Sequence, residues 1–293
     1  MLLLDRSDVR HLRREGGLLT RHVRFRGPTG VETGVVVDGE VVGDGGTRVR
    51  PLDAATLALP DPYELLLPVE PPEVWCAGVT YERSRDARVE ESAVRDVYTL
   101  VYDADRPELF LKDASCRRTV GPGAPIAVRS DSSWNVPEPE IALVLDGGSG
   151  LAGVTIGNDV SSRDIEGANP LYLPQAKVYA GACALGPALL SPAPDEPFDI
   201  RMRIVDETGA ERFSGETSTS RMKRSFGELV EFLLRDNPVP PGSVLLTGTG
   251  LVPPDDFTLE PGHVVEIEVP GIGTLANPVV LASSLLERSA ANV

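Results

Sequence analysis

Lysine and histidine are scarce in this chain of 293 residues, and positive charge is scarce with them. Acidic residues outnumber basic residues by 44 to 28, which leaves a formal net charge of −16. Nucleic acids and anionic membranes attract clustered positive charge, so we expect neither as a partner. Chemistry that needs several lysines or histidines must draw on three of each: Lys112, Lys177 and Lys223, and His11, His22 and His263.

Cysteine and long apolar runs are also rare. Cys76, Cys116 and Cys183 are odd in number and lie far apart, so we expect neither a disulfide framework nor a Cys-x-x-Cys zinc site. No stretch has the apolar length of a membrane span, and the first residues, MLLLDRSDVRHLRREGG, lack the apolar core of a signal peptide. We therefore expect a reduced, cytoplasmic protein.

The sequence does contain many short apolar stretches separated by glycine and proline. Its composition, 41% hydrophobic and 25% charged, is that of a globular protein. We predict a mainly β fold with some α-helix (α+β). The strands predicted after residue 73 are 108–112, 139–145, 153–160, 199–206, 243–247, 264–269 and 274–280.

Two helices are predicted in the same part of the chain. Residues 83–102 are polar and charge-rich, which is typical of an exposed helix. The second helix is indicated by apolar residues that share one helical face, namely Met222, Phe226, Leu229, Val230 and Leu233. Thr219 or Ser220 is its predicted N-cap.

Composition divides the chain near residue 70. Residues 1–70 are predicted to form a small β-rich domain, with two strands around an Asp-Gly turn in GVETGVVVDGEVVG. Residues 59–73 hold five prolines and indicate a linker. Residues 71–285 then form the larger domain.

The chemistry is concentrated in the sequence WNVPEPEIALVL. Residues two apart on a strand share a face, so Glu138 and Glu140 lie side by side. The glycines at 147, 148 and 150 predict a hairpin with the next strand, which brings Asp159 to the same place. Three carboxylates suit Mg²⁺ or Mn²⁺ rather than zinc. A Glu-x-Glu pair alone is more often the solvated face of a strand, and that alternative stays open.

Three further features lie near this cluster in sequence. Lys177 lies in an apolar, aromatic segment, which favours either a desolvated base or carboxylate partner, or a lysine that snorkels to solvent; Lys112 invites the same readings. Arg163 is either a clamp for a substrate carboxylate or a partner of Asp164. The turn Gly248-Thr249-Gly250 follows a strand and offers N–H groups to an anion.

Taken together, these segments resemble the fumarylacetoacetate hydrolase family from about residue 72 to residue 280. The resemblance rests on WCAGVTYERS, RPELFLK, PEPEIALVL, GNDVSSRD, TSTSRMKRSFGELVEFL and LLTGTG. It implies a mixed β-sandwich roll, usually assembled as a homodimer or homotetramer. It also implies that Glu138, Glu140 and Asp159 bind Mg²⁺, with Mn²⁺ or Ca²⁺ as alternatives. A 2-oxo acid would contact residues that include Lys112, Lys177, Arg163, Tyr81, Gly248 and Thr249.

One departure from the family bears on the reaction. Hydrolytic members carry a histidine in the run that here reads TYERSRDA, and this chain has none there. Longer blocks such as NPLYLPQAKVYAG resemble the family's dehydratases of 3-deoxy-2-oxo sugar acids. That resemblance implies a metal-stabilised enolate, Lys177 as the base, and Glu90 or Glu91 as the acid. The alternatives are an acylpyruvate-type C–C hydrolase, an oxaloacetate decarboxylase or tautomerase, and a non-catalytic β domain with a structural cation.

Overall fold

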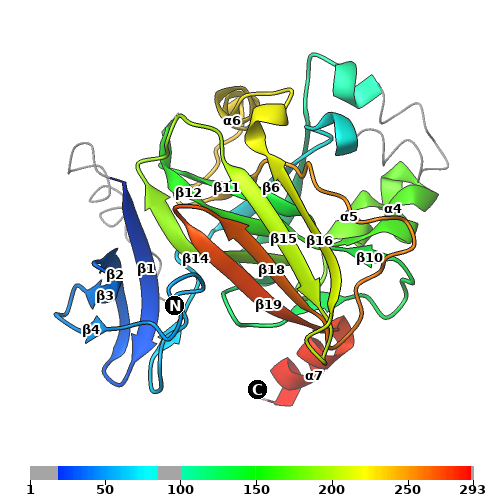
Figure 1. The fold of residues 1–293 in the computed structure, drawn as a ribbon. Coiled ribbons are helices and arrows are strands. Elements are labelled where there is room, and N and C mark those ends of the chain that lie inside the picture. The colour runs from blue at the N-terminus through cyan, green and yellow to red at the C-terminus, as the bar shows by residue number, and fades with distance from the viewer. Residues whose placement is uncertain (1–18, 85–99, 149, 292–293) are drawn as a thin grey trace.

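The computed structural model describes residues 19–84, 100–148 and 150–291. Strands account for 42% of the structure and helices for 15%, so the predicted mainly β class is confirmed. Figure 1 shows a sandwich of strands, with the N-terminal strands on one side and the short helices α4 and α5 on the other. None of the described helices is long and apolar enough to cross a lipid bilayer.

The larger sheet has twelve strands among the described residues, in the order β4-β3-β2-β1-β14-β12-β11-β17-β6-β7, with β5 on β1 and β8 on β14. Its strands are β1 (Thr20–Gly27), β2 (Gly30–Val37), β3 (Glu40–Gly43), β4 (Arg48–Val49), β5 (Glu64–Leu65), β6 (Glu73–Gly78), β7 (Glu108–Ala114), β8 (Thr119–Val120), β11 (Pro139–Leu145), β12 (Leu151–Asp159), β14 (Cys183–Ser191) and β17 (Val244–Leu246).

This sheet curls, because the chain that leaves its far edge returns to its middle. β7 is the last strand in the order, yet β8 follows it after four residues and pairs with β14. Asp113 fixes the connection by accepting backbone hydrogen bonds from Arg117, Arg118 and Thr119. The C-terminal end of β7 therefore lies close to the last residue of β12, Asp159, and the first residue of β14, Cys183.

A second sheet of five strands covers one face of the first. Its order is β16-β15-β18-β19-β9. The strands are β9 (Ile126–Val128), β15 (Asp199–Val205), β16 (Glu211–Ser218), β18 (Val264–Val269) and β19 (Gly273–Leu281). Ile141 and Leu143 of β11 share one buried apolar cluster with Ile200 and Ile267 of this sheet, so the main core lies between the layers.

The inside of the curled sheet is a second, smaller core. Ala142 and Val144 of β11 belong to it, together with Cys76, Leu185 and Leu246. All seven residues of β11 are buried, because one face of the strand meets the inner core and the other meets the second sheet. A polar side chain on β11 must therefore find a partner inside the protein.

The helices are short and lie at the margins of the sheets. They are α4 (Arg163–Ala168), α5 (Leu173–Lys177), α6 (Phe226–Leu234) and α7 (Ala282–Ala291), and a two-stranded sheet joins β10 (Asn135–Val136) to β13 (Ser161–Ser162). Of the predicted helix 83–102, most lies outside the described residues, and residues 82–84 and 100–103 are helical.

The predicted N-cap of the second helix, Thr219 or Ser220, is wrong, because the observed N-cap lies five or six residues later. α6 begins at Phe226, and Ser225 caps it by accepting a hydrogen bond from the backbone N–H of Glu228. Met222 lies before the helix and forms an isolated bridge with Tyr81. The Ser-x-x-Glu spacing is a capping-box pattern and was the better signal for the helix start.

The N-terminal strands continue the larger sheet, because β1 pairs with β14. The predicted turn is confirmed: Asp38 and Gly39 both have positive φ angles, as a two-residue hairpin turn requires. The proline-rich stretch contributes β5, which pairs with β1. The boundary near residue 70 stays a prediction about how the chain is organised.

Candidate metal centre and active site

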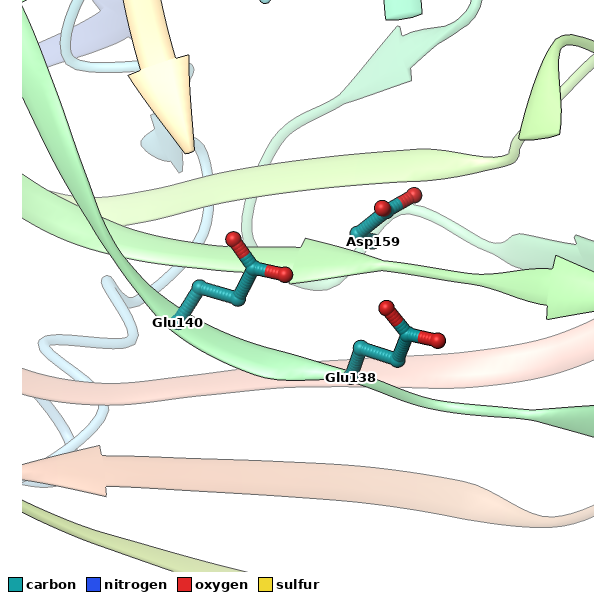
Figure 2. Close-up of side chains that lie close together, drawn as sticks. All are labelled: Glu138, Glu140 and Asp159. Carbon is teal, nitrogen blue, oxygen red and sulfur yellow. The ribbon is translucent and has the colours of Figure 1, made fainter. Parts of the chain in front are cut away.

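Three carboxylates converge at the open end of the hairpin formed by β11 and β12. Glu138 precedes β11, Glu140 lies on it, and Asp159 is the last residue of β12. The predicted antiparallel pairing is confirmed, with Pro139 opposite Asn158. One oxygen from each carboxylate lies within 4.8 Å of the others, and Figure 2 shows the three side chains directed toward a common space.

The position of the cluster follows from strand alternation. Glu138 and Glu140 share a face with Ala142 and Val144, which line the inside of the curled sheet. The carboxylates therefore stand where the inner apolar core ends. All three are buried, at 1–3% exposure, so the solvated-strand alternative is excluded.

Burial and mutual repulsion make Glu140 hard to ionise by itself. Burial raises its pKa well above the ordinary value, and the charges of Asp159 and Glu138 raise it further. Gly248 opposes this effect through its backbone N–H, which donates to Glu140 Oε2 at 2.6 Å. A side chain at position 248 would collide with the Thr80 hydroxyl, and φ there is +89°, so only glycine brings this N–H to the carboxylate.

Two buried lysines balance part of this negative charge. Lys177, the last residue of α5, donates to Glu138 Oε2 at 2.8 Å, Asp159 Oδ2 at 3.0 Å and Ser161 Oγ at 2.6 Å. Lys112 forms an ion pair with the other oxygen of Asp159. Burial alone would raise the pKa of Asp159, but the two lysines outweigh it and the pKa is lowered. Asp159 is therefore held as an anion.

Arg163 extends the network away from the lysines. Its Nη1 lies 3.2 Å from Glu166 Oε2 and 3.4 Å from Glu138 Oε1, and its side chain is buried. Asp164, the alternative partner suggested by the sequence, accepts hydrogen bonds from Ser132 and Ser133 instead. Arg163 thus supports a ligand carboxylate from within the protein.

A small cavity of about 10 Å³ lies among these groups, which is room for about one water or ion. Several predicted site residues line it, namely Glu138, Glu140, Asp159, Lys177, Gly248 and Thr249. Lys112, Arg163 and Tyr81 are not among its described lining residues. Glu90 and Glu91 lie outside the described residues.

Tyr81 is packed behind the Gly-Thr-Gly turn rather than against the cavity. Its ring meets Gly250 so closely that a Cβ there would lie 2.5 Å from Tyr81 Cδ1. Burial raises the pKa of the Tyr81 hydroxyl, and the charge of Glu140 adds to this effect. In this arrangement Tyr81 supports the turn that holds Glu140.

Sequence reasoning missed three polar residues that line the cavity, which are Ser84, Glu108 and Glu166. Glu108 could have been found from the sequence. It lies two residues before Phe110 on β7, so the two side chains share a face of the strand, and Phe110 also lines the cavity. Strand alternation from Lys112 back to Glu108 predicts that face. Glu166 had the weaker signal of a carboxylate one helical turn after Arg163.

The donor set fits a hard divalent cation. It consists of carboxylate oxygens, which Mg²⁺, Mn²⁺ and Ca²⁺ prefer. Cys76 lies nearby in the inner core, but burial and the charges of Asp159 and Glu140 raise the pKa of its thiol well above the ordinary value. Neither cysteine nor histidine is among the described residues that line the cavity, so its donor set disfavours zinc.

The fold and this centre define a β-sandwich protein with a buried carboxylate cluster that could hold a metal ion, and sequence comparison gives its family. Residues 73–280 match the family described as fumarylacetoacetate (FAA) hydrolase C-terminal. The chain belongs to the fumarylacetoacetate hydrolase family. The predicted resemblance is confirmed.

Two curated relatives and one solved structure show which kind of protein within the family this chain is similar to. The chain is 51% identical over 215 residues to the probable 2-keto-3-deoxyxylonate dehydratase of Haloferax volcanii, covering 73% of this chain and 74% of that one. It is 45% identical over 250 residues to the 2-dehydro-3-deoxy-D-arabinonate dehydratase of Saccharolobus solfataricus, covering 82% of each. A structure of 2-keto-3-deoxy-D-arabinonate dehydratase complexed with magnesium and 2,5-dioxopentanoate matches with a TM-score of 0.78 at 38% identity, covering 88% and 98% of the two chains.

Proposed function

We propose that this chain is a magnesium-dependent dehydratase of a 3-deoxy-2-oxo sugar acid. The proposed substrate is 2-dehydro-3-deoxy-D-arabinonate, and the product is 2,5-dioxopentanoate. The buried centre of Glu138, Glu140 and Asp159, with Lys177 in the same cavity, is the observation that carries the proposal. Its support is the similarity to dehydratases over most of the chain.

The proposed reaction removes one water in balanced steps. A proton leaves C3 and the hydroxyl leaves C4 with an added proton, which forms a C3–C4 double bond. Tautomerisation then converts the C5 alcohol into an aldehyde, while C4 and C3 regain hydrogen. The only other product is water, so no oxidant or reductant is needed.

The metal ligands in this proposal are Glu138, Glu140 and Asp159. When bound, magnesium supplies Lewis-acid stabilisation of the negative charge that develops on the 2-oxo group. Lys177, in its neutral amine form, accepts the C3 proton, a role supported by its position in the cavity lining. Thr249 and the Gly248 turn border the same space and contact the substrate.

The acid that protonates the departing hydroxyl is a carboxyl group. The sequence predicts Glu90 or Glu91 for this role. Among the described residues, Glu108 and Glu166 line the cavity without belonging to the three-carboxylate centre, which makes them the other two candidates. Single Glu→Gln variants at the four positions assign the role, because only loss of the acid slows release of the C4 hydroxyl while C3 exchange continues.

Mass spectrometry of products tests the proposed activity directly. The protein is incubated with Mg²⁺ and a panel of 3-deoxy-2-oxo sugar acids, acylpyruvates and oxaloacetate. We expect loss of one water from a 3-deoxy-2-oxo pentonate. Cleavage of an acylpyruvate would favour a C–C hydrolase, loss of CO₂ from oxaloacetate would favour a decarboxylase, and no change in any compound would favour a non-catalytic domain.

We also propose that the protein assembles as a homodimer or homotetramer. Large apolar side chains are exposed on the described surface, including Leu171 at 84% and Leu52 at 74%. Where such side chains form a contiguous patch, they are typical of a surface that a partner subunit covers. Sedimentation equilibrium of the full chain tests this, and a single monomeric species would contradict it.

A further inference from the structure

We propose that Lys112 is a positioning residue, which holds Asp159 in its metal-binding orientation from behind the cavity. This differs from the substrate contact predicted from the sequence, and it rests on the proposed metal site. A ligand's supporting partners govern metal affinity nearly as strongly as the ligand does. The inference therefore assigns Lys112 a measurable effect on metal binding when no substrate is present.

The contacts of Lys112 leave it no freedom to reach a substrate. Its Nζ forms the ion pair with Asp159 Oδ1 and donates to the backbone carbonyl of Val160 at 2.9 Å. The same Nζ lies 6.0 Å from the centre of the Tyr179 ring, and the side chain is fully buried. These contacts fix the ammonium group against the backbone that carries Asp159.

Lys112 and Lys177 hold different oxygens of the same carboxylate. Lys177 contacts Asp159 Oδ2 and lines the cavity, whereas Lys112 contacts Oδ1 and is not among the described lining residues. With one cation on each oxygen, the carboxylate plane of Asp159 cannot rotate without breaking a buried ion pair. Lys112 thus fixes the ligand, and Lys177 remains the lysine that faces the reacting groups.

The curl of the larger sheet explains why this lysine can reach the site. Lys112 lies on β7, at the far end of the strand order from β12, but β8 brings the chain back to β14 beside Asp159. The Lys112 ammonium group therefore comes from β7, across the point where the sheet curls back on itself, and not from the β11–β12 hairpin that carries the three carboxylates. Its position therefore depends on the larger fold and not on the mobility of a loop.

Binding of Mn²⁺ to the substrate-free full chain, measured by electron paramagnetic resonance of the free ion, tests the inference. In Lys112→Met we expect Mn²⁺ affinity to fall by about 10–100-fold. Lys223→Met is the matched control, because the described hydrogen bonds of the Lys223 ammonium group go to Tyr102 and Asp103 and not to the three carboxylates. Its Mn²⁺ affinity should equal that of the wild type.

Steady-state kinetics distinguish positioning from substrate contact. If Lys112 positions Asp159, excess Mg²⁺ restores most of the turnover of Lys112→Met and the KM for substrate stays near the wild-type value. Unchanged Mn²⁺ affinity with a raised substrate KM would overturn the inference. If Lys112→Met does not fold, Lys112→Gln keeps a donor for Val160 and serves for both measurements.

Failure of the inference can be told apart from failure of the proposed function. A wild-type protein that does not bind Mn²⁺ contradicts the metal site itself. A wild-type protein that binds Mn²⁺, together with Lys112 variants of unchanged affinity, contradicts only the role of Lys112.

Discussion

The same Glu-x-Glu pattern occurs twice in this protein, with opposite outcomes. Glu138 and Glu140 at the start of β11 are buried and belong to the candidate metal centre. Glu266 and Glu268 on β18 lie at the surface and pair across the sheet with two arginines, at 3.1 and 3.5 Å. Spacing alone therefore does not separate a metal site from a solvated strand.

The difference arises from what covers each strand. β18 is covered on one face only, so Val265 and Ile267 enter the core while Glu266 and Glu268, which alternate with them, face away from it. β11 is covered on both faces, and the apolar run IALVL that follows Glu140 is the sequence signature of such a strand. A Glu-x-Glu pair that leads into a continuous apolar run is thus the informative form of the pattern.

The largest contrast should appear when one glutamate of each pair is changed. Glu138→Gln removes a ligand carboxylate, so we expect it to abolish measurable Mn²⁺ binding and to lower turnover by roughly a thousandfold or more. Glu266→Gln, the matched control, should change neither. Calorimetric titration with Mn²⁺ and product formation measure both, and full wild-type activity in excess EDTA would refute the metal assignment.

Loss of the cavity lysine should have the next largest effect. Lys177→Met removes the proposed base, so turnover should fall by roughly 10²–10⁴-fold. Exchange of the substrate's C3 hydrogens with deuterated solvent, followed by NMR, isolates the proton-transfer step. Wild-type exchange in Lys177→Met would remove Lys177 from that role, and Lys223→Met should exchange normally.

The pH dependence of metal binding should also separate the two glutamate pairs. The pKa of Glu140 is raised, so its proton competes with the metal as the pH falls toward that pKa. Mn²⁺ affinity should therefore weaken on mild acidification, by about tenfold per pH unit where one proton is exchanged. Affinity that stays constant over this range would contradict the protonation of Glu140, and Glu268→Gln should leave the wild-type profile unchanged.

Stability without metal should show the smallest contrast. Glu140 is a buried carboxyl group whose ionisation is disfavoured, so Glu140→Gln in EDTA should keep or raise the free energy of unfolding. Glu268 is 48% exposed in its surface pair, and Glu268→Gln should change that energy by less than about 0.5 kcal/mol. Urea unfolding measures both, and a clear loss of stability in Glu140→Gln would contradict the argument.

Features that depend on residues close together in the sequence could be predicted from it. The hairpin of β11 and β12 follows from two apolar runs around a glycine-rich turn, and strand alternation then places Glu138, Glu140 and Asp159 together. Strands 139–145 and 264–269 have their predicted bounds. The buried position of Lys177 followed from its apolar neighbours, and its contact with two carboxylates agrees with one of the two readings.

Features that depend on distant segments were not predictable. The contact between Lys112 and Asp159 requires the curl that returns β8 to β14, and no local pattern encodes that closure. The partners of Arg163 include Glu138, which is far from it in sequence: Glu138 follows β10, Arg163 follows β13, and the pairing of these two strands brings them together. The sequence shows that Lys112, Arg163 and Glu138 are present, but it does not show which of them are close together in the folded protein.

The scarcity of lysine has a practical consequence once the structure is known. Two of the three ammonium groups are sealed in the protein, with side-chain exposures of 0% for Lys112 and 3% for Lys177, while Lys223 is 34% exposed. An amine-reactive label, the terminal amine apart, should attach to the folded protein at Lys223. Among the lysine side chains, a dye or surface linker can therefore be placed at one defined point without engineering the chain.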